Sequence, residues 1–355
     1  MNNQCTVFVG MSGGVDSSVA AKRLLDQGYS VVGVFIKVWQ PDFIVCNWEQ
    51  ERLDAMRVAA HLGIPFLTCD AEADYKQGVA DYFISEYLAG RTPNPDVMCN
   101  QKVKFGSFMR FANAHGADAI ATGHYVQKQV GAHGAELHRG IDVEKDQSYF
   151  LWTLSDEQLD YSLFPIGNTD KSSIRDEALA AGIPTAQKAD SQGICFLGHV
   201  DIPDFLSHYT TLTSGAVLDT EGNVIGEHKG ALVYTIGQRH GFTITVSHQS
   251  QQPHYIQSRD LENNTITVAP DKPIRTATTE LKLESVTLRA SAQLQVGDTI
   301  QFQTRYRQTP YEGKVVSQEN HTLTITPRSH IEAVASGQSC VLYNGSHCFG
   351  GGIIS

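Results

Sequence analysis

The stretch Gly10-Met-Ser-Gly-Gly-Val-Asp-Ser-Ser18 decides the fold of the N-terminal part of this chain. It follows an apolar run at 6–9 that is typical of a short buried strand, and it precedes a helical pattern over 19–27. Glycines let a backbone approach an anion closely, and the N–H groups at a helix start point toward it. The three serines of the stretch add hydroxyl donors. The sequence therefore predicts a phosphate-binding strand, loop and helix.

This loop lacks the lysine of a Walker loop, which ends in Gly-Lys followed by Ser or Thr. It resembles instead the Ser-Gly-Gly-x-Asp-Ser loop (PP-loop) of the ATP pyrophosphatases. Members of that group cleave ATP between the α- and β-phosphates and adenylate an oxygen. An ordinary strand-to-helix turn is the alternative interpretation of these residues.

The composition is typical of a soluble globular protein. Of the 355 residues, 41% are hydrophobic and 18% charged, and no apolar run approaches the ~20 residues that span a bilayer. The first residues include no basic stretch, so we expect no signal peptide, a cytoplasmic location and no membrane partner. Seven cysteines without a C-x-x-C pair argue against a disulfide framework and a zinc site. The net charge of −11 argues against indiscriminate nucleic-acid binding.

Residues 1–125 alternate between strands and helices. Strands are expected at 31–35, 66–68 and 119–121, and helices at 48–62, 74–88 and 105–114. Helical stretches of this length between strands imply parallel βαβ units and an α/β doubly wound parallel sheet. Ligands of such sheets bind at the carboxyl ends of the strands, so we expect Gly10 and Thr122-Gly-His124 at one edge.

The pattern changes in the second half of the chain. A helix is expected at 171–181, but from about residue 211 short alternating runs lie between turn signals, which is typical of all-β structure. The sequence thus predicts a catalytic ATP-binding domain at 1–210, a small β-rich central module at 211–275 and a C-terminal β-barrel at 276–355. The barrel segment has six basic and six acidic residues, so it can present a local cationic face to RNA.

Two cysteines lie in segments that can carry chemistry. Cys99 follows Arg91-Thr-Pro-Asn-Pro-Asp96, whose two prolines predict a stiff, non-helical loop. Asp96 could move a proton there, and two nearby lysines would favour a thiolate. Cys195 lies in Asp190-Ser-Gln-Gly-Ile-Cys-Phe196. On local grounds each thiol could equally be a small buried side chain, as we expect for the other five cysteines.

Taken together, the motifs resemble one family from end to end. Besides the loop and the two cysteine segments, they are Ala121-Thr-Gly-His-Tyr125, Lys145-Asp-Gln-Ser-Tyr-Phe150, Thr235-Ile-Gly-Gln-Arg239, Arg305-Tyr-Arg-Gln308 and Gly350-Gly-Gly-Ile-Ile354. In this order they are similar to the motifs of the tRNA-specific 2-thiouridylases, the MnmA family. These enzymes replace the C2 oxygen of the wobble uridine with sulfur.

The resemblance implies a role for each matching residue. ATP would be bound by residues of the loop and of strand ends: Gly10, Met11, Ser12, Gly13, Gly14, Val15, Asp16, Ser17, Ile36 and Gly123. The target base would be contacted by Asn94, Pro95 and Asp96. The rest of the tRNA would be contacted by His124, Lys145, Asp146, Gln147, Arg305, Tyr306 and Gln338.

The resemblance also implies the chemistry and the partners. Cys195 would carry a persulfide, Cys99 would be the second, nucleophilic thiol, and the two would form a transient disulfide. Asp96 would be a candidate acid or base. ATP, with Mg²⁺ offsetting charge, would convert the uridine oxygen into a leaving group. The partners would be the anticodon arm of tRNA, whose target base must leave its stack, and a persulfide donor, either a cysteine desulfurase or a sulfur-relay protein.

Some features leave alternatives open. Gln192 stands where many members have Thr, and residues 37–43 differ from the acidic insertion common in the family, which bears on the sulfur donor. Cys99, Cys195 and Asp96 could also ligate an iron–sulfur cluster. The competing functions are an ATP pyrophosphatase acting on a small molecule, a tRNA thiolase for another base, and a non-enzymatic RNA-binding protein. The first needs no paired cysteines, and some of the second carry C-x-x-C pairs, which are absent here.

Overall fold

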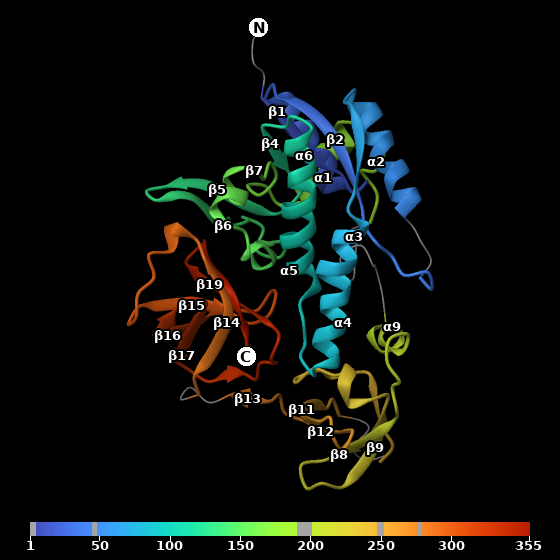
Figure 1. The fold of residues 1–355 in the computed structure, drawn as a ribbon, viewed down its shortest axis with the longest axis vertical. Coiled ribbons are helices and arrows are strands. Elements are labelled where there is room, and N and C mark those ends of the chain that lie inside the picture. The colour runs from blue at the N-terminus through green and yellow to red at the C-terminus, as the bar shows by residue number, and fades with distance from the viewer. Residues whose placement is uncertain (1–4, 45–47, 190–200, 247–251, 276–278) are drawn as a thin grey trace.

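The computed structural model describes residues 5–44, 48–189, 201–246, 252–275 and 279–355. Three bodies follow one another in Figure 1: an α/β body at the top, a β-rich module at the bottom and a barrel at the left. In the described residues, no helix combines the length and the apolar character needed to cross a membrane.

The N-terminal body contains a five-stranded sheet in which every neighbouring pair is parallel. Its order is β3-β2-β1-β4-β7. The strands are β1 (Thr6–Gly10), β2 (Ser30–Lys37), β3 (Phe66–Asp70), β4 (Ala119–Ala121) and β7 (Ser162–Leu163). The central position of β1 puts the loop that follows it between the loops that follow β2 and β4.

Helices cover both faces of this sheet, which confirms the doubly wound prediction. Val7 and Val9 of β1 point into one core and Phe8 into the other, as the two-residue period of a strand requires. The first core is covered by α1 (Val15–Asp26), α2 (Trp48–Leu62) and α8 (Lys171–Ala180). The second is covered by α3 (Glu72–Tyr75), η1 (Lys76–Ala80), α5 (Pro95–Cys99), η2 (Asn100–Ser107) and α6 (Phe108–Ala114).

The prediction of a non-helical loop through residue 100 is wrong. Pro95 is the first residue of α5, and Asn94 caps that helix by accepting a hydrogen bond from the Val97 N–H at 3.3 Å. A proline is tolerated in the first helical turn because the N–H that it lacks has no intrahelical partner there. From Pro95 the chain stays helical through η2 and α6 to Ala114. Cys99 therefore lies on a helix, as the last residue of α5.

The central module is a five-stranded sheet of order β10-β9-β8-β12-β11. Its strands are β8 (Gly215–Leu218), β9 (Val224–His228), β10 (Phe242–Ile244), β11 (Tyr255–Asp260) and β12 (Thr265–Ala269). Its core includes Phe205 from α9 (Ile202–Ser207) and Phe83 and Tyr87 from α4 (Asp81–Leu88). The module thus packs on the helix that precedes the Cys99 segment.

The C-terminal strands close into a barrel because β14 pairs with both β17 and β20. The barrel strands are β14 (Leu281–Leu288), β15 (Thr299–Gln303), β16 (Tyr311–Glu319), β17 (Thr322–Pro327), β19 (Ser339–Asn344) and β20 (His347–Ile354). A separate two-stranded pair, β13 (Ile274–Arg275) with β18 (Ile331–Glu332), lies beside the barrel. The β-rich C-terminal half predicted from the sequence is confirmed.

A hairpin from the N-terminal half extends the barrel sheet. The strands β5 (Val126–Gly131) and β6 (Gly134–Arg139) pair with each other, and β6 pairs with β20. Beside the hairpin, the buried Arg289 side chain donates to the Leu154 carbonyl at 3.1 Å and to the Cys348 carbonyl at 2.5 Å. The barrel is therefore fixed to the first domain, while the domain limits at 210 and 275 stay predictions.

Candidate active site

The loop after β1 has the local geometry of an anion-binding turn. Gly13 has a φ of +70°, and a methyl group on it would lie 2.7 Å from the Glu51 carbonyl oxygen, so only glycine fits. The Ser17 and Ser18 hydroxyls donate to the Gly14 carbonyl at 3.3 and 2.7 Å. No side chain caps the start of α1, where the first N–H groups of a helix lack intrahelical partners. These groups have the arrangement of a phosphate-binding loop, and phosphate binding by them stays a prediction.

The neighbouring strands complete this edge of the sheet. Gly123 follows β4, and a methyl group on it would lie 2.7 Å from the Ser17 nitrogen and 2.8 Å from the Asp16 carbonyl carbon. On the other side, a methyl group on Gly10 would lie 3.5 Å from Ile36 at the end of β2. The structure thus brings all the residues predicted to bind ATP to one edge, from Gly10 through Ser17 with Ile36 and Gly123.

Asp16 has two partners that the sequence did not predict. The Tyr125 hydroxyl donates to its Oδ1 at 2.7 Å, and the Lys171 ammonium lies 2.6 Å from the same oxygen. Lys171 belongs to α8 and lies 155 positions further along the chain. Both side chains are largely buried; the Lys171 ammonium neutralises the one carboxylate of the loop, and the Tyr125 hydroxyl helps to orient it.

The predicted base-contacting residues lie at the start of α5. Asp96 is half-buried in the first turn, and the Cys99 side chain is fully buried at 0% exposure. The Asn94 side chain, besides capping α5, bonds to the Tyr149 hydroxyl, which donates to the Ser339 carbonyl at 2.9 Å. Burial raises the pKa of Tyr149, so this hydroxyl stays a donor. Asn94 is therefore linked to the barrel.

The residues just before α5 contact both β-rich parts. The Thr92 N–H donates to the Ser336 carbonyl at 2.8 Å, and the Gln338 amide donates to the Thr92 carbonyl at 3.0 Å. The Thr92 hydroxyl lies 3.1 Å from the Thr235 hydroxyl of the central module. The segment that ends at Cys99 is thus held at a junction of all three parts.

Three predicted tRNA contacts near the ATP loop have internal partners. The buried His124 ring forms a 2.8 Å hydrogen bond with the Thr122 hydroxyl. Burial of the ring, and to a lesser degree the charge of Lys104, holds the pKa of His124 well below its usual range. Asp146 is buried and accepts from Arg139 at 2.9 Å, while Gln147 accepts from the Tyr125 N–H at 3.0 Å. These contacts order the segment that contains Lys145, and tRNA binding by these residues stays a prediction.

The other predicted tRNA contacts lie on the barrel. The Arg305 guanidinium donates to the Ile236 carbonyl at 3.0 Å and lies 3.5 Å from Glu332, with about a third of the side chain exposed. The Tyr306 ring packs on Phe150 at 4.5 Å between ring centres. A pocket of about 350 Å³ lies beside them. It is lined by Arg305, Tyr306, Arg307, Gln308, Thr309, Tyr311 and Glu332.

Cys195, the predicted persulfide residue, lies outside the described residues. The chain that leads to it is fixed as far as Lys188, whose ammonium lies 2.9 Å from Asp54 on α2, beside Gly13. Of the other five cysteines, Cys69, Cys340 and Cys348 are buried, as expected for a structural role. The expectation is wrong for Cys5, which is exposed at the start of the described residues, and Cys46 lies outside them. Burial, with nearby carboxylates, raises the pKa of Cys69 to about 11, so it is a thiol at neutral pH.

Three family models match this chain in succession. They are a tRNA methyl transferase HUP domain at 5–199, a tRNA methyl transferase PRC-barrel domain at 203–270 and an aminomethyltransferase beta-barrel domain at 278–354. A tRNA-specific 2-thiouridylase MnmA of Listeria monocytogenes is 41% identical over 99% of this chain and 95% of its own length. Those of Enterococcus faecalis and Haemophilus ducreyi are 40% and 41% identical over 99% of this chain, and 96% and 93% of their lengths.

The HUP-type sheet, its phosphate-binding loop and the matched models define an ATP-using, PP-loop enzyme that modifies tRNA. The descriptions of these family models refer to methyl transfer, whereas the relatives that match 99% of this chain are each named tRNA-specific 2-thiouridylase MnmA. The chain belongs to the MnmA family of tRNA-specific 2-thiouridylases and is a tRNA sulfurtransferase. Its substrate is tRNA.

Proposed function

We propose that this enzyme adenylates the C2 oxygen of the wobble uridine and then replaces it with sulfur from a persulfide on Cys195. One contact carries the proposal. A methyl group on Gly10 would lie 3.4 Å from Phe108, which belongs to the same helical run as Cys99. The helical run that contains Cys99 therefore passes beside the ATP loop at Phe108, so a substrate lying along this run would reach both the activated phosphate and the thiol.

The loop suits an adenine nucleotide. Side chains on Gly13 or Gly123 would collide with backbone atoms, so glycines at these positions allow the chain to pack tightly around the start of α1. The N–H groups at that helix start would then be accessible to phosphate. Residues 10–17 would bind the phosphates, with Ile36 and Gly123 beside the nucleoside. The Asp16 carboxylate is the oxygen ligand that would hold Mg²⁺ together with phosphate oxygens. The ion would offset negative charge on the transferring group.

The first step makes the uridine oxygen a leaving group. Asn94, Pro95 and Asp96 hold the base, and Asp96 accepts the N3 proton as the C2 oxygen bonds to the α-phosphorus. The bond between the α-phosphorus and the oxygen of the β-phosphate breaks, and pyrophosphate leaves. The uridine C2 then carries AMP, which departs in the second step.

The second step transfers sulfur with balanced electrons. Cys99 attacks the Cys195 sulfur of the persulfide, the S–S bond of the persulfide breaks, and sulfide attacks C2 as AMP leaves. The two electrons that reduce the transferred sulfur come from the two cysteines, which become a disulfide. In the alternative order the persulfide sulfur attacks C2 first and Cys99 then frees the product, with the same balance. A dithiol reductant resets the pair.

The partners follow from the two steps. A persulfide donor, either a cysteine desulfurase or a sulfur-relay protein, loads Cys195. The anticodon arm is held by His124, Lys145, Asp146, Gln147, Arg305, Tyr306 and Gln338, by phosphate contacts that position it and base contacts that specify it. The reaction takes place in the cytoplasm, where unmodified tRNA and reductant are available.

The test uses the purified full chain with ATP, Mg²⁺, unmodified tRNA and a persulfide donor. We expect 2-thiouridine by mass spectrometry, with AMP and pyrophosphate formed in equal amounts. A tRNA with cytidine at the wobble position is the matched control and should yield neither. Thiolation without pyrophosphate release would reject the adenylation step, and AMP formed with a small-molecule acceptor in place of tRNA would favour the competing function.

A further inference from the structure

The PP-loop of this chain has no lysine, yet the fold brings one to it. Lys171 is the first residue of α8, and its ammonium lies 2.6 Å from Asp16 Oδ1 with only 13% of the side chain exposed. A buried ammonium is an ideal partner for an anion, because low dielectric strengthens the attraction. The only carboxylate of the loop meets this cation at the start of α1, where the cradle for phosphate lies.

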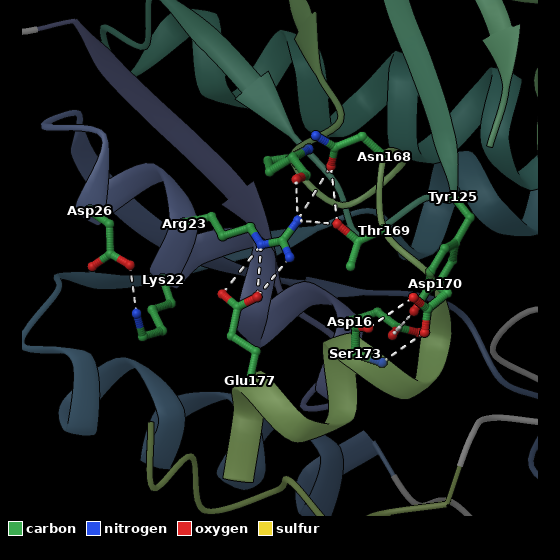
Figure 2. A network of polar contacts seen from close by, with 11 residues as sticks. Asp16, Lys22, Arg23, Asp26, Tyr125, Asn168, Thr169, Asp170, Ser173 and Glu177 are labelled. Carbon is green, nitrogen blue, oxygen red and sulfur yellow. Dashed lines mark hydrogen bonds and ion pairs between the residues drawn. The ribbon is translucent and has the colours of Figure 1, made fainter. Parts of the chain in front are cut away.

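The position of Lys171 is fixed by a second ion pair between the same two helices. The Arg23 guanidinium of α1 lies 2.7 Å from Glu177 of α8 and also donates to the Thr169 hydroxyl at 2.8 Å (Figure 2). Asp16 and Arg23 are ~10 Å apart along α1, and Lys171 and Glu177 are ~9 Å apart along α8, at 1.5 Å per residue. The two pairs therefore match in spacing and hold α1 and α8 side by side, with their N-terminal ends together.

Helix stability does not explain a lysine at this position. A cation in the first turn opposes the helix dipole, which favours acidic residues there. The cap itself is supplied by Asp170, which accepts from the Ser173 N–H at 2.9 Å, and Asp142 accepts from the Lys171 N–H at 2.9 Å. With its backbone already capped, α8 presents the Lys171 side chain, rather than its N–H groups, to the loop.

The residues for the two parts of the proposed reaction lie on different faces of the sheet. Helices α1 and α8 lie on one face, and the helix with Asp96 and Cys99 lies on the other. The α-phosphorus must face the uridine on the Asp96 side. The departing phosphates then lie toward the start of α1, where Lys171 is.

We propose that Lys171 is a catalytic residue for ATP cleavage. When ATP binds, its ammonium exchanges Asp16 for the β- and γ-phosphates, and it stabilises the charge that develops on pyrophosphate as the bond to the α-phosphorus breaks. It thereby supplies from α8 the positive charge that a Walker loop carries within itself. In the absence of nucleotide the same ammonium neutralises Asp16, which would otherwise repel phosphate. The inference rests on the adenylation proposed above.

The test is nucleotide affinity, measured for ATP, ADP and AMP with Mg²⁺ by equilibrium dialysis. Loss of a charged contact to the terminal phosphates should weaken ATP binding to Lys171→Met by ~10–100-fold and AMP binding by less than about threefold. Lys171→Arg should retain most of the ATP affinity. Lys22→Met is the matched control, because Lys22 also pairs with an aspartate of α1, Asp26 at 2.5 Å, but at the far end of the helix.

Two further measurements separate the possible outcomes. If Lys171 only neutralises Asp16, the double variant Asp16→Asn, Lys171→Met will recover the ATP affinity of Asp16→Asn alone, and the proposal is overturned. Equal losses for ATP and AMP, with circular dichroism showing an intact fold, would overturn it as well. Pyrophosphate release by the wild-type enzyme with tRNA is scored separately. Its absence would reject adenylation, whereas the ratio of ATP to AMP affinity decides whether Lys171 contacts the β- and γ-phosphates.

Discussion

The ATP loop at 10–17 and the segment at 90–99 that ends at Cys99, here called the thiol segment, are built in different ways. The loop at 10–17 owes its shape to hydrogen bonds among its own residues and to glycines packed against α2 and the β4 end. The thiol segment at 90–99 is held from outside, by Ser336 and Gln338 of the barrel region and Thr235 of the central module. The proposed nucleotide site is thus built within one domain, whereas the proposed thiol segment is held by contacts from all three.

This difference has a consequence for mutations. A change in the barrel can disturb the residues around Cys99 through Thr92. The ATP loop is instead linked through Asp16 to the Tyr125 hydroxyl, and the Tyr125 N–H donates to Gln147. Changes in the loop, in turn, should leave the thiol segment folded. We therefore expect variants of the two regions to separate ATP chemistry from sulfur chemistry.

The largest expected effect is that of Cys99→Ser. Loss of the nucleophilic thiol should slow thiolation by ~10³-fold or more, because serine cannot resolve a persulfide, while ATP affinity stays unchanged. The rate is measured as 2-thiouridine formed with a purified donor. Cys5→Ser is the control, since Cys5 is exposed and precedes the start of β1, at the end of that strand opposite to the loop. Normal thiolation by Cys99→Ser would mean that the two-thiol mechanism is wrong.

Asp16→Ala should have the next largest effect, on the ATP side alone. Without this carboxylate, pyrophosphate release should fall by ~100-fold, comparable to the loss of one preorganised charge-stabilising group, while tRNA affinity stays within about twofold. Pyrophosphate is measured by a coupled phosphate assay. Asp26→Ala changes an acid at the other end of α1 and serves as the control. Undiminished ATP cleavage would remove Asp16 from its assigned role.

Arg305→Ala tests the side of the molecule that is built from several domains. If Arg305 contacts a tRNA phosphate, the KM for tRNA should rise by ~10-fold and the salt slope of binding should fall by about one. Arg328→Ala removes an exposed barrel arginine that pairs with Glu312 and is the control. An unchanged slope would mean that Arg305 only ties the barrel to Ile236 of the central module.

The smallest expected effect is a pH dependence of stability from His124. Its pKa is lowered in the folded protein by burial, so as pH falls below about 6.5 the unfolded chain takes up the proton first. The contribution to stability is therefore intact above that pH and is lost as pH falls toward the folded pKa. The unfolding free energy of His124→Gln should depend on pH less steeply, by up to ~1.4 kcal/mol per unit.

Urea denaturation between pH 7.5 and 5.5 measures this difference. The exposed His133→Gln, in the turn between β5 and β6, should match the wild type. Equal slopes for His124→Gln and the wild type would show that the pKa of His124 is the same in the folded and the unfolded protein. Such a result would favour direct pairing of His124 with a tRNA phosphate.

The sequence by itself determined the ATP loop, the parallel sheet and the β-rich C-terminal half. Each of these depends on short-range patterns, such as a strand, a glycine turn and a helix within about twenty residues. Where the local rule had an exception, the prediction failed: prolines usually exclude helix, but Pro95 stands at the first helical position, where a proline fits. Only the cap supplied by Asn94 could have signalled that start.

The tertiary structure alone decided which distant residues complete the site. Tyr125 and Lys171 reach Asp16, the β5–β6 hairpin joins the barrel, and Thr92 is held by two other parts of the chain. Contacts between residues more than a hundred positions apart leave no periodicity in the sequence, since they depend on how whole elements pack. The loop lysine that the sequence lacked is present in space, because α8 lies along α1 with opposite charges facing at both ends.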